Sequence, residues 1–369
     1  MIKNRLRPCY VIIILLLYGC SINISQPFTM STVPTSTAQS NKDSSAGNTP
    51  GTIPPSANTI LITWGSLNIT GKLVYTTALI QNDRQLVNIQ ILDLTTGKIT
   101  IVFQTPDGGW VDAATVSPDD KQLMLSYTPP GNGQQNALYI MPLDGSQTPQ
   151  LLFTPPSVDD RYFQPEWSPD GKYIYCVQYN YKTATIYSLM RTAYPGGVLE
   201  KLADNAYWPR TSGDGSSIVY VSPAFGVNTL FVSNSDGSGA HQISITGPYI
   251  PKVIDSPMFL AGDKTILFSA PVVGLSSMPN WVDDLFGITV ASADGSIPSD
   301  WWSIPLAGGI PKRLTHLQSM ALFARFSPDK KHIASYSSDG IFIMNPDGTS
   351  VTQVLNNTGG TPGTVNWIP

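Results

Sequence analysis

The feature that most constrains the fold is a repeat that runs from about Leu73 to the C-terminus. Its clearest copy begins at Phe163 and contains WSPDGKYIYCVQY, then TIYSLM, then GVLEKL. A tandem repeat of about 40 to 50 residues is typical of propellers and other repeat architectures. The copies align on one turn residue, which is Ser117, Ser168, Ser212, Ala261 and Ser327 in successive copies.

Each copy predicts four short strands. A Ser-Pro-Asp-Gly turn suits a tight connection, because Pro fixes φ and Gly or Asp tolerates a positive φ. The strand after it, such as YIYCVQY, is rich in β-branched and aromatic residues. A second strand ends in Asp-Gly or Gly-Gly, which favours a hairpin, and a weaker third strand follows. With the short strand before the turn, the unit matches a four-stranded propeller blade.

The C-terminus predicts how the ring closes. Trp367-Ile368-Pro369 matches Trp167-Ser168-Pro169, and the chain stops where the next strand would begin. The first strand of the domain, within GKLVYTTALI, has no such strand before it. We therefore expect an all-β, six-bladed propeller of four-stranded antiparallel blades, in which the C-terminal strand completes the N-terminal blade and leaves no open sheet edge. Five or seven blades remain alternatives, because Ile60 to Trp64 could form an extra strand.

Two pairs of segments carry a family resemblance. WSPDGKYIYC with IYSL, and FSPDKKHIAS with IFIMNPDGT, resemble the repeat of TolB-type propellers, a branch of the wider WD40-like class. The resemblance covers about residues 72 to 369, without the Trp-Asp signature of true WD40 repeats. It implies the fold and says little about function, because one fold hosts many functions.

The first twenty residues predict an export signal. Three basic residues precede an apolar run from Tyr10 to Tyr18, which is too short to span a bilayer as a helix. The run ends in LYGC at Cys20, which resembles the bacterial lipobox. That resemblance implies that Cys20 is lipidated and becomes the mature N-terminus. An ordinary secretory signal with a chance cysteine is the alternative.

A polar stretch follows the signal. Residues 21–58 are dominated by Ser, Thr, Pro and Gly, a composition that favours disorder. A flexible coil of this length reaches roughly 35 Å. We therefore expect a signal peptide over residues 1–19, a lipid-anchored linker over 20–58 and the propeller over 59–369. The propeller would lie outside the cytoplasm, tethered to either the cytoplasmic or the outer membrane.

Charge and motifs exclude several functions. The net charge is −4 and no basic cluster is present, so we expect no nucleic-acid partner. The chain has no G-x-S-x-G, H-E-x-x-H or C-x-x-C motif, and its three histidines fall in repeat positions. We therefore expect no catalytic residue, no metal site and no cofactor. Asp-Gly turns such as Asp170-Gly171 are explained by turn formation, although their carboxylates are possible Ca²⁺ ligands.

Aromatic residues suggest a binding role. The unit between Phe268 and Trp301 carries an insertion, and long propeller loops are often functional. The candidate binding-loop residues are Trp281, Phe286 and Trp301, and a lid packed on its own blade is the alternative for the insertion. Since Trp301 and Trp302 are adjacent in a strand, we expect at most one of them in the core.

These observations favour a monomeric binding or scaffolding lipoprotein with a protein, peptide or polysaccharide ligand. The alternative is a polysaccharide lyase or glycosidase that pairs acids across the channel, with Glu166 and Asp255 as candidates. A purely structural envelope protein is a third possibility. Cys176, the one cysteine beyond the N-terminal segment, is expected to be a buried apolar residue.

Overall fold

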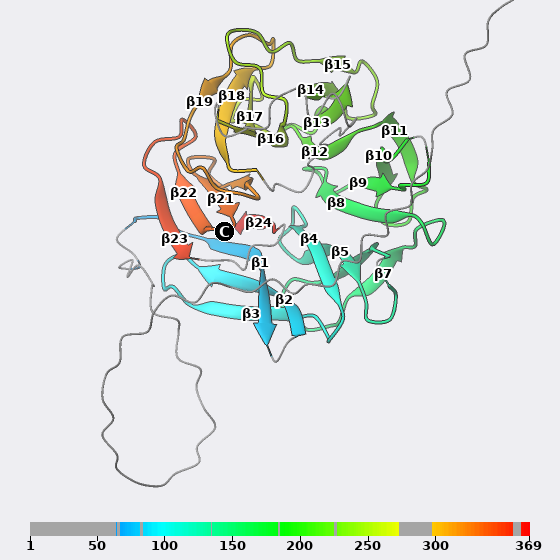
Figure 1. The fold of residues 1–369 in the computed structure, drawn as a ribbon. Helices are drawn as coiled ribbons and strands as arrows, with labels where there is room; N and C mark the ends of the chain where they lie inside the picture. The colour runs from blue at the N-terminus through cyan, green and yellow to red at the C-terminus, as the bar shows by residue number, and fades with distance from the viewer. Residues whose placement is uncertain are drawn as a thin grey trace, which may run out of the picture. The chain divides into compact units, whose positions relative to one another are not determined.

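The strands of this protein form six blades around a central axis (Figure 1). They belong to the unit Ser56–Pro369, which is described here by itself. The computed structural model describes residues 64, 67–81, 84–133, 135–183, 185–224, 227–272, 297–356 and 363–369. Across these residues, no helix is long and apolar enough to cross a membrane.

Each blade is one antiparallel sheet of four strands. The innermost strands are β4 (Trp110–Val116), β8 (Arg161–Trp167), β12 (Tyr207–Thr211), β16 (Asp255–Phe259), β20 (Phe323–Phe326) and β24 (Val365–Ile368). The second strands are β5 (Gln122–Thr128), β9 (Tyr173–Tyr179), β13 (Ser217–Ala224), β17 (Thr265–Pro271), β21 (Ile333–Ser337) and β1 (Lys72–Gln81). The third strands are β6 (Ala137–Pro142), β10 (Tyr187–Ala193), β14 (Val227–Asn234), β18 (Ser299–Pro305), β22 (Gly340–Met344) and β2 (Arg84–Asp93). The outermost strands are β7 (Gln150–Phe153), β11 (Glu200–Asp204), β15 (His241–Gln242), β19 (Lys312–Arg313), β23 (Thr352–Asn356) and β3 (Ile99–Gln104).

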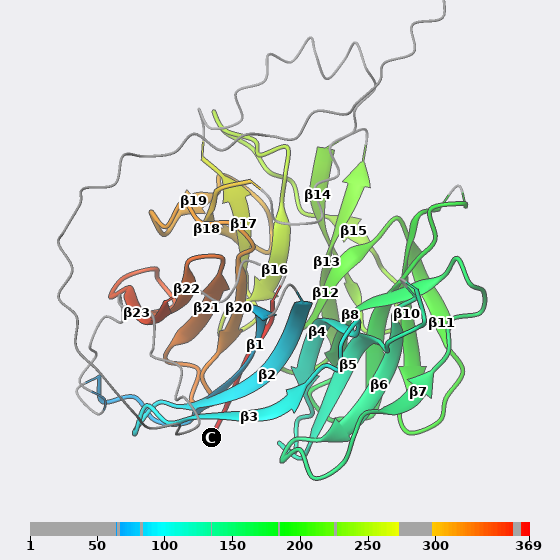
Figure 2. The same ribbon diagram turned by 60° about the horizontal axis from the view of Figure 1, so that its bottom comes forward.

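The two ends of the propeller share one blade, as the sequence predicts. β24 lies beside β1 (Figure 2) and pairs antiparallel with it. In that pairing Trp367 lies opposite Leu73. The Trp367 indole Nε1–H donates to the Thr70 carbonyl at 3.2 Å. The sheet order β24-β1-β2-β3 confirms both the six-bladed count and the predicted closure.

Four of the blades share one turn after their inner strand. In each, a serine Oγ donates to the aspartate two residues later at 2.6–2.7 Å, and accepts the backbone N–H five residues later at 2.8–3.0 Å. The serines are Ser117, Ser168, Ser212 and Ser327. In the fifth copy the equivalent residue is Leu260 and not Ala261, because Leu260 N–H bonds to Thr265 as Ser212 N–H bonds to Ser217.

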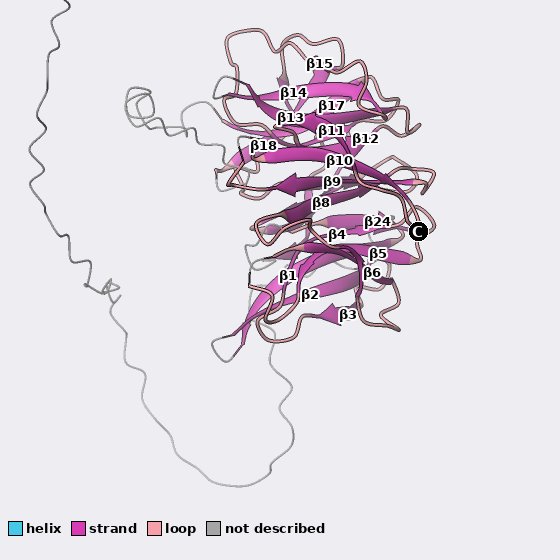
Figure 3. Cartoon of the chain, turned by 90° about the vertical axis from the view of Figure 1, so that its right-hand side faces the viewer, coloured by secondary structure: helices cyan, strands magenta, loops and turns pink. Residues whose placement is uncertain are grey.

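The core lies between blades, as the stacked strands of Figure 3 show. Trp301 packs with Leu267 and Ile333, and Trp302 packs in a different cluster with Phe268. Both tryptophans are buried, with exposed fractions of 0% and 8%. The expectation that only one of them is core is therefore wrong, because neighbouring blades cover both faces of a sheet and alternation along β18 exposes neither side chain.

Cys176 lies in β9 and is fully buried, packed with Met124 and Ile174. Burial raises the pKa of its thiol above the ordinary value. The predicted role as a small apolar core residue is confirmed, and the thiol is kept in its neutral form.

Candidate functional site

Three consecutive inner strands carry a bulge that redirects their side chains. The pairing register shifts within β8, β12 and β16. At each shift a non-glycine residue has positive φ: Gln164 at 50°, Trp208 at 55° and Ser256 at 47°. The Gln164 Oε1 accepts the Trp208 backbone N–H at 2.6 Å, so two adjacent bulges are joined. Left-handed backbone at such residues costs free energy and concentrates at functional sites.

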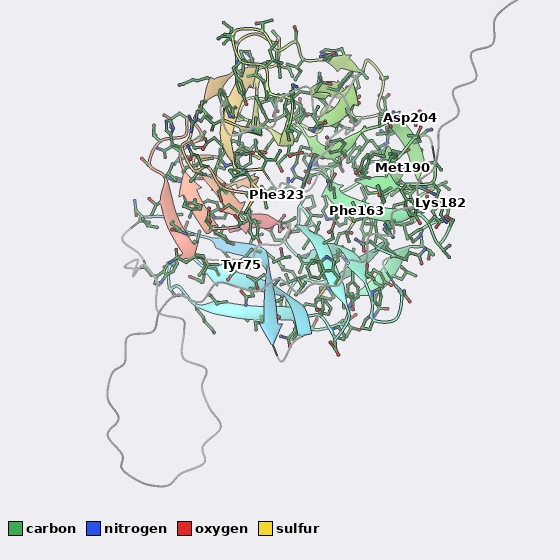
Figure 4. All side chains as sticks on the ribbon, viewed as in Figure 1. Tyr75, Phe163, Lys182, Met190, Asp204 and Phe323 are labelled. Carbon is green, nitrogen blue, oxygen red and sulfur yellow. The ribbon has the colours of Figure 1, made fainter. Side chains whose placement is uncertain are left out.

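A pocket of about 390 Å³ lies at the end of the channel where the inner strands begin. Its walls are mainly aromatic and come from several blades. The lining residues used below are Asp112, Arg161, Phe163, Tyr179, Tyr187, Trp208, Arg210, Phe323 and Arg325. In Figure 4, Phe163 and Phe323 lie on either side of the middle of the ring, whereas Lys182 and Asp204 lie at its rim. The volume falls within the range of small-ligand sites.

The rings of the wall contact one another. Phe163 packs edge-on against Tyr179 at 5.8 Å between centroids, and Tyr179 lies 5.2 Å from Tyr187. On the other side, Trp208 lies 6.0 Å from Phe323. These rings come from β8, β9, β10, β12 and β20, so the wall exists only when the blades are assembled.

An ion cluster forms the deep end of this pocket. The Arg210 Nη1 donates to Glu166 Oε2 at 3.0 Å, and the Arg325 Nη1 donates to Glu166 Oε1 at 3.1 Å. The Arg325 Nη2 also contacts Glu166 Oε2, and it lies 3.5 Å from the Thr115 hydroxyl. Two guanidinium groups thus share one carboxylate, which leaves the cluster with a net positive charge.

Arg210 is enclosed by protein. Its exposed fraction is 3%, and its guanidinium carbon lies 4.2 Å from the centroid of the Phe323 ring. Burial, and then repulsion by Arg325, lower the pKa of Arg210 to about 9, against the opposing effect of Glu166. Arg210 therefore remains a cation at neutral pH, in surroundings where an ionic interaction is strong.

Two more charged residues line the pocket. Burial raises the pKa of Asp112 to about 6, although a side-chain hydrogen bond with Trp110 acts in the opposite direction. The Arg161 guanidinium lies over the Tyr179 ring at 5.8 Å. A carboxyl group with a raised pKa in a cleft is a marker of functional sites.

A second pocket, of about 260 Å³, lies at the other end of the inner strands. Its lining includes Glu166, Ser168, Arg325 and Asn366. Arg325 lines both pockets, so the ion cluster separates the aromatic end of the channel from this more polar end.

The candidate residues from the sequence fall in different places. Trp281, Phe286 and Cys20 lie outside the described residues. The prediction that Trp301 is a binding-loop residue is wrong. Trp301 lies inside β18, is fully buried, and donates its Nε1–H to Ser335 Oγ at 2.8 Å.

The two candidate acids are not brought into one pocket. Glu166 lines the second pocket, whereas Asp255, buried in β16, lines neither of the two. Both Glu166 carboxylate oxygens accept hydrogen bonds from arginines. Within the described ranges, no three His, Cys, Asp or Glu side chains gather as they would around a metal ion.

The ion cluster was not predicted from the sequence, although its three residues occupy the same position of the repeat. Glu166, Arg210 and Arg325 each stand two residues before the turn serine of their copy. The strand pairing gives the equivalent residue of the other three blades as Thr115, Met258 and Asn366. Reading that one position across the six copies would have exposed three charges on inner strands.

Comparison with known proteins supports the fold. No protein-family model matches the chain, and no curated protein matches its sequence. TolB from Acinetobacter baumannii is 16% identical with a TM-score of 0.58, over 81% of this chain and 67% of that chain. A putative TolB from Agrobacterium tumefaciens is 18% identical with a TM-score of 0.56, over 82% and 99%. A chain of a nidogen/laminin complex is 10% identical with a TM-score of 0.54, over 80% and 98%. The chain is thus a TolB-like six-bladed propeller in fold, and at these identities the likeness extends to fold alone.

Proposed function

We propose that this protein is a binding module that holds its ligand in the aromatic pocket at one end of the propeller channel. The observation that carries the proposal is the pocket itself, with rings from several blades around a buried cationic end. A concave, mostly apolar site with a few placed polar groups is the usual form of a ligand site. The ligand would be a protein, a peptide or an envelope polysaccharide.

The proposal includes a place of action. The apolar run before Cys20 and the polar stretch after it support an exported, lipid-anchored protein with its propeller outside the cytoplasm. A monomer on a flexible linker would present the pocket to partners within reach of the membrane.

We propose binding in preference to catalysis because of how Glu166 is held. A glycosidase needs two acids placed on either side of its substrate. Here both Glu166 oxygens accept arginine hydrogen bonds, and Asp255 lines neither pocket.

A photocrosslinking experiment tests the binding role. Benzoylphenylalanine replaces Phe163 in the pocket wall of the full-length protein. In the control protein it replaces the exposed Tyr173, which lies outside the pocket lining. Irradiation in native cells, followed by mass spectrometry, should give a discrete adduct from the Phe163 position only. Adducts at neither position, or equally at both, would contradict a binding role for the pocket.

The anchor needs its own arm of that experiment. A Cys20→Ser version of the Phe163 crosslinking protein should lose its membrane association and keep the adduct when the partner is present in excess. Retention of membrane association by Cys20→Ser would contradict the proposed lipid anchor without touching the pocket.

A further inference from the structure

The hydrogen bonds of the pocket wall are unbalanced. Two buried N–H groups, Trp208 Nε1 and Arg210 Nη2, have no acceptor among the residues that the structure describes. No buried side-chain acceptor of the described lining residues is in the same condition. An unmatched buried donor costs about 1–3 kcal/mol, more when it is charged. The wall therefore lacks acceptors specifically.

The two residues that carry these donors pack against one ring. Both come from β12, one on each side of Pro209, and both side chains pack against the Phe323 ring. The charge of the cluster also favours a negatively charged acceptor, because Arg210 and Arg325 share the single carboxylate of Glu166. A group that supplies acceptor oxygens and negative charge together would satisfy both requirements.

The rest of the pocket favours an apolar group. Phe163, Tyr179 and Tyr187 line it, and its volume of about 390 Å³ is far larger than a compact inorganic anion needs. Aromatic walls gain free energy by covering apolar surface. The ligand therefore needs an apolar or aromatic body next to its anionic group.

We propose that the pocket selects a carboxylate carried on an apolar or aromatic body. This inference rests on the binding role proposed above and names the chemistry of the ligand. The carboxylate lies between Arg210 and Arg325 and accepts from the Trp208 indole, while the apolar body lies against Phe163 and Tyr187. Since both unmatched donors are buried, the Phe323 ring, which packs against both side chains, shifts to let the carboxylate reach them.

Matched probes test this inference by titration calorimetry on the full-length protein. 3-Phenylpropionate and its neutral amide differ only in the charged group. The carboxylate should bind at least about tenfold more tightly than the amide, as expected for one charge-assisted hydrogen bond. Equal affinities would overturn the inference and leave the binding role intact.

A second pair of probes distinguishes the source of the carboxylate. Acetyl-Gly-Gly-Phe with a free C-terminus and its amidated form carry the same group at the end of a peptide. Tighter binding of the free peptide than of 3-phenylpropionate indicates the C-terminus of a chain, and the reverse order indicates a free organic acid. If no probe binds at millimolar concentration, the inference is overturned, while the crosslinking experiment separately decides the binding role.

Three variants assign the preference to residues. Arg210→Met should bring the ratio of carboxylate to amide affinity toward one, and Trp208→Phe, which removes only the indole donor, should lower that ratio by about threefold. Asp112→Asn removes a competing negative charge and should raise the carboxylate affinity about threefold. This gain cannot result from misfolding, so the inference stays testable even when Arg210→Met does not fold. No gain from Asp112→Asn together with no loss from Trp208→Phe would overturn the assignment.

Discussion

The turn after each inner strand and the residue two positions before it belong to the same repeat, yet the copies agree at the first and differ at the second. Four turns are built from the same serine and aspartate, with hydrogen bonds that agree within 0.1 to 0.2 Å. The position two residues earlier holds Thr115, Glu166, Arg210, Met258, Arg325 and Asn366.

This difference follows from what each position contacts. The serine and aspartate of each of these turns bond within their own hairpin, so one solution serves four copies. The earlier position lies on the inner strand, where Glu166 contacts Arg210 of the next blade and Arg325 from elsewhere in the ring. In another copy, the same position holds Met258, which packs in the core with Trp301. Substitutions at the two places should therefore differ in size, in uniformity and in their dependence on pH.

The largest effect is expected at Glu166. Glu166→Gln keeps the shape of the side chain but leaves the buried Arg210 and the partly buried Arg325 without a counter-charge. We expect the free energy of unfolding to fall by about 3–5 kcal/mol, as for a broken buried ion pair. Chemical denaturation followed by tryptophan fluorescence measures this change.

Glu200→Gln is the matched control, because Glu200 pairs with Arg191 at 2.5 Å while its side chain is 54% exposed. That pair should contribute less than about 1 kcal/mol. Equal losses of unfolding free energy for the two variants would show that the channel cluster stabilises the protein no more than a surface ion pair does.

A gain in stability is expected at Asp112. Its folded-state pKa of about 6 lies above the ordinary value of 3.8, so the wild type loses stability as pH rises from about 4 to about 6. Asp112→Asn has no such loss and should be more stable at pH 7 by about 1–2 kcal/mol.

Urea denaturation at pH 4 and at pH 7 tests this. The advantage of Asp112→Asn should be small at pH 4 and fully developed at pH 7. Asp204→Asn, at a carboxylate that is 52% exposed, is the surface control for the substitution itself. An advantage that does not depend on pH would mean that the Asp112 proton is not its source.

The turns should give smaller and uniform effects. Replacing Ser168, Ser212 or Ser327 by alanine, one at a time, removes the same two hydrogen bonds in different blades. Each variant should lose about 1 kcal/mol of unfolding free energy. Thermal denaturation of the three variants checks this, and losses that differ severalfold between blades would break the contrast between turn and channel.

The sequence predicted the turns and the ring closure well because both depend on short patterns. Ser168 and Trp367 can be recognised from the residues beside them in the sequence. The pairing of β24 with β1 follows because the N-terminal blade has no inner strand of its own before β1. The ion cluster could be predicted only in part. The repeat places Glu166 and Arg325 at equivalent positions, but their contact joins residues 159 apart in the chain and depends on the curvature of the ring.

Two other features depend on packing that no local pattern records. The bulges at Gln164 and Trp208 aim side chains into the channel, although neither residue is a glycine. Trp301 alternates with Trp302 as a half-exposed strand would, yet both are buried because blades stack on both faces of β18. Alternation predicts exposure only where one face of a sheet meets water.

The smallest effect concerns the charge of the turns. Hydrogen bonds, that from Ser212 first, lower the pKa of Asp214 to about 2 from an ordinary value of 3.8. A lowered folded-state pKa gives stability that is present above pH 4 and is lost as pH falls toward 2. The difference in unfolding free energy between wild type and Ser212→Ala should therefore shrink by a few tenths of a kcal/mol from pH 5 to pH 2, since Asp214 is exposed. Denaturant titrations at the two pH values measure the difference. A constant difference would mean that the turns act through shape alone, and the pH-dependent part of the contrast would then lie entirely in the channel.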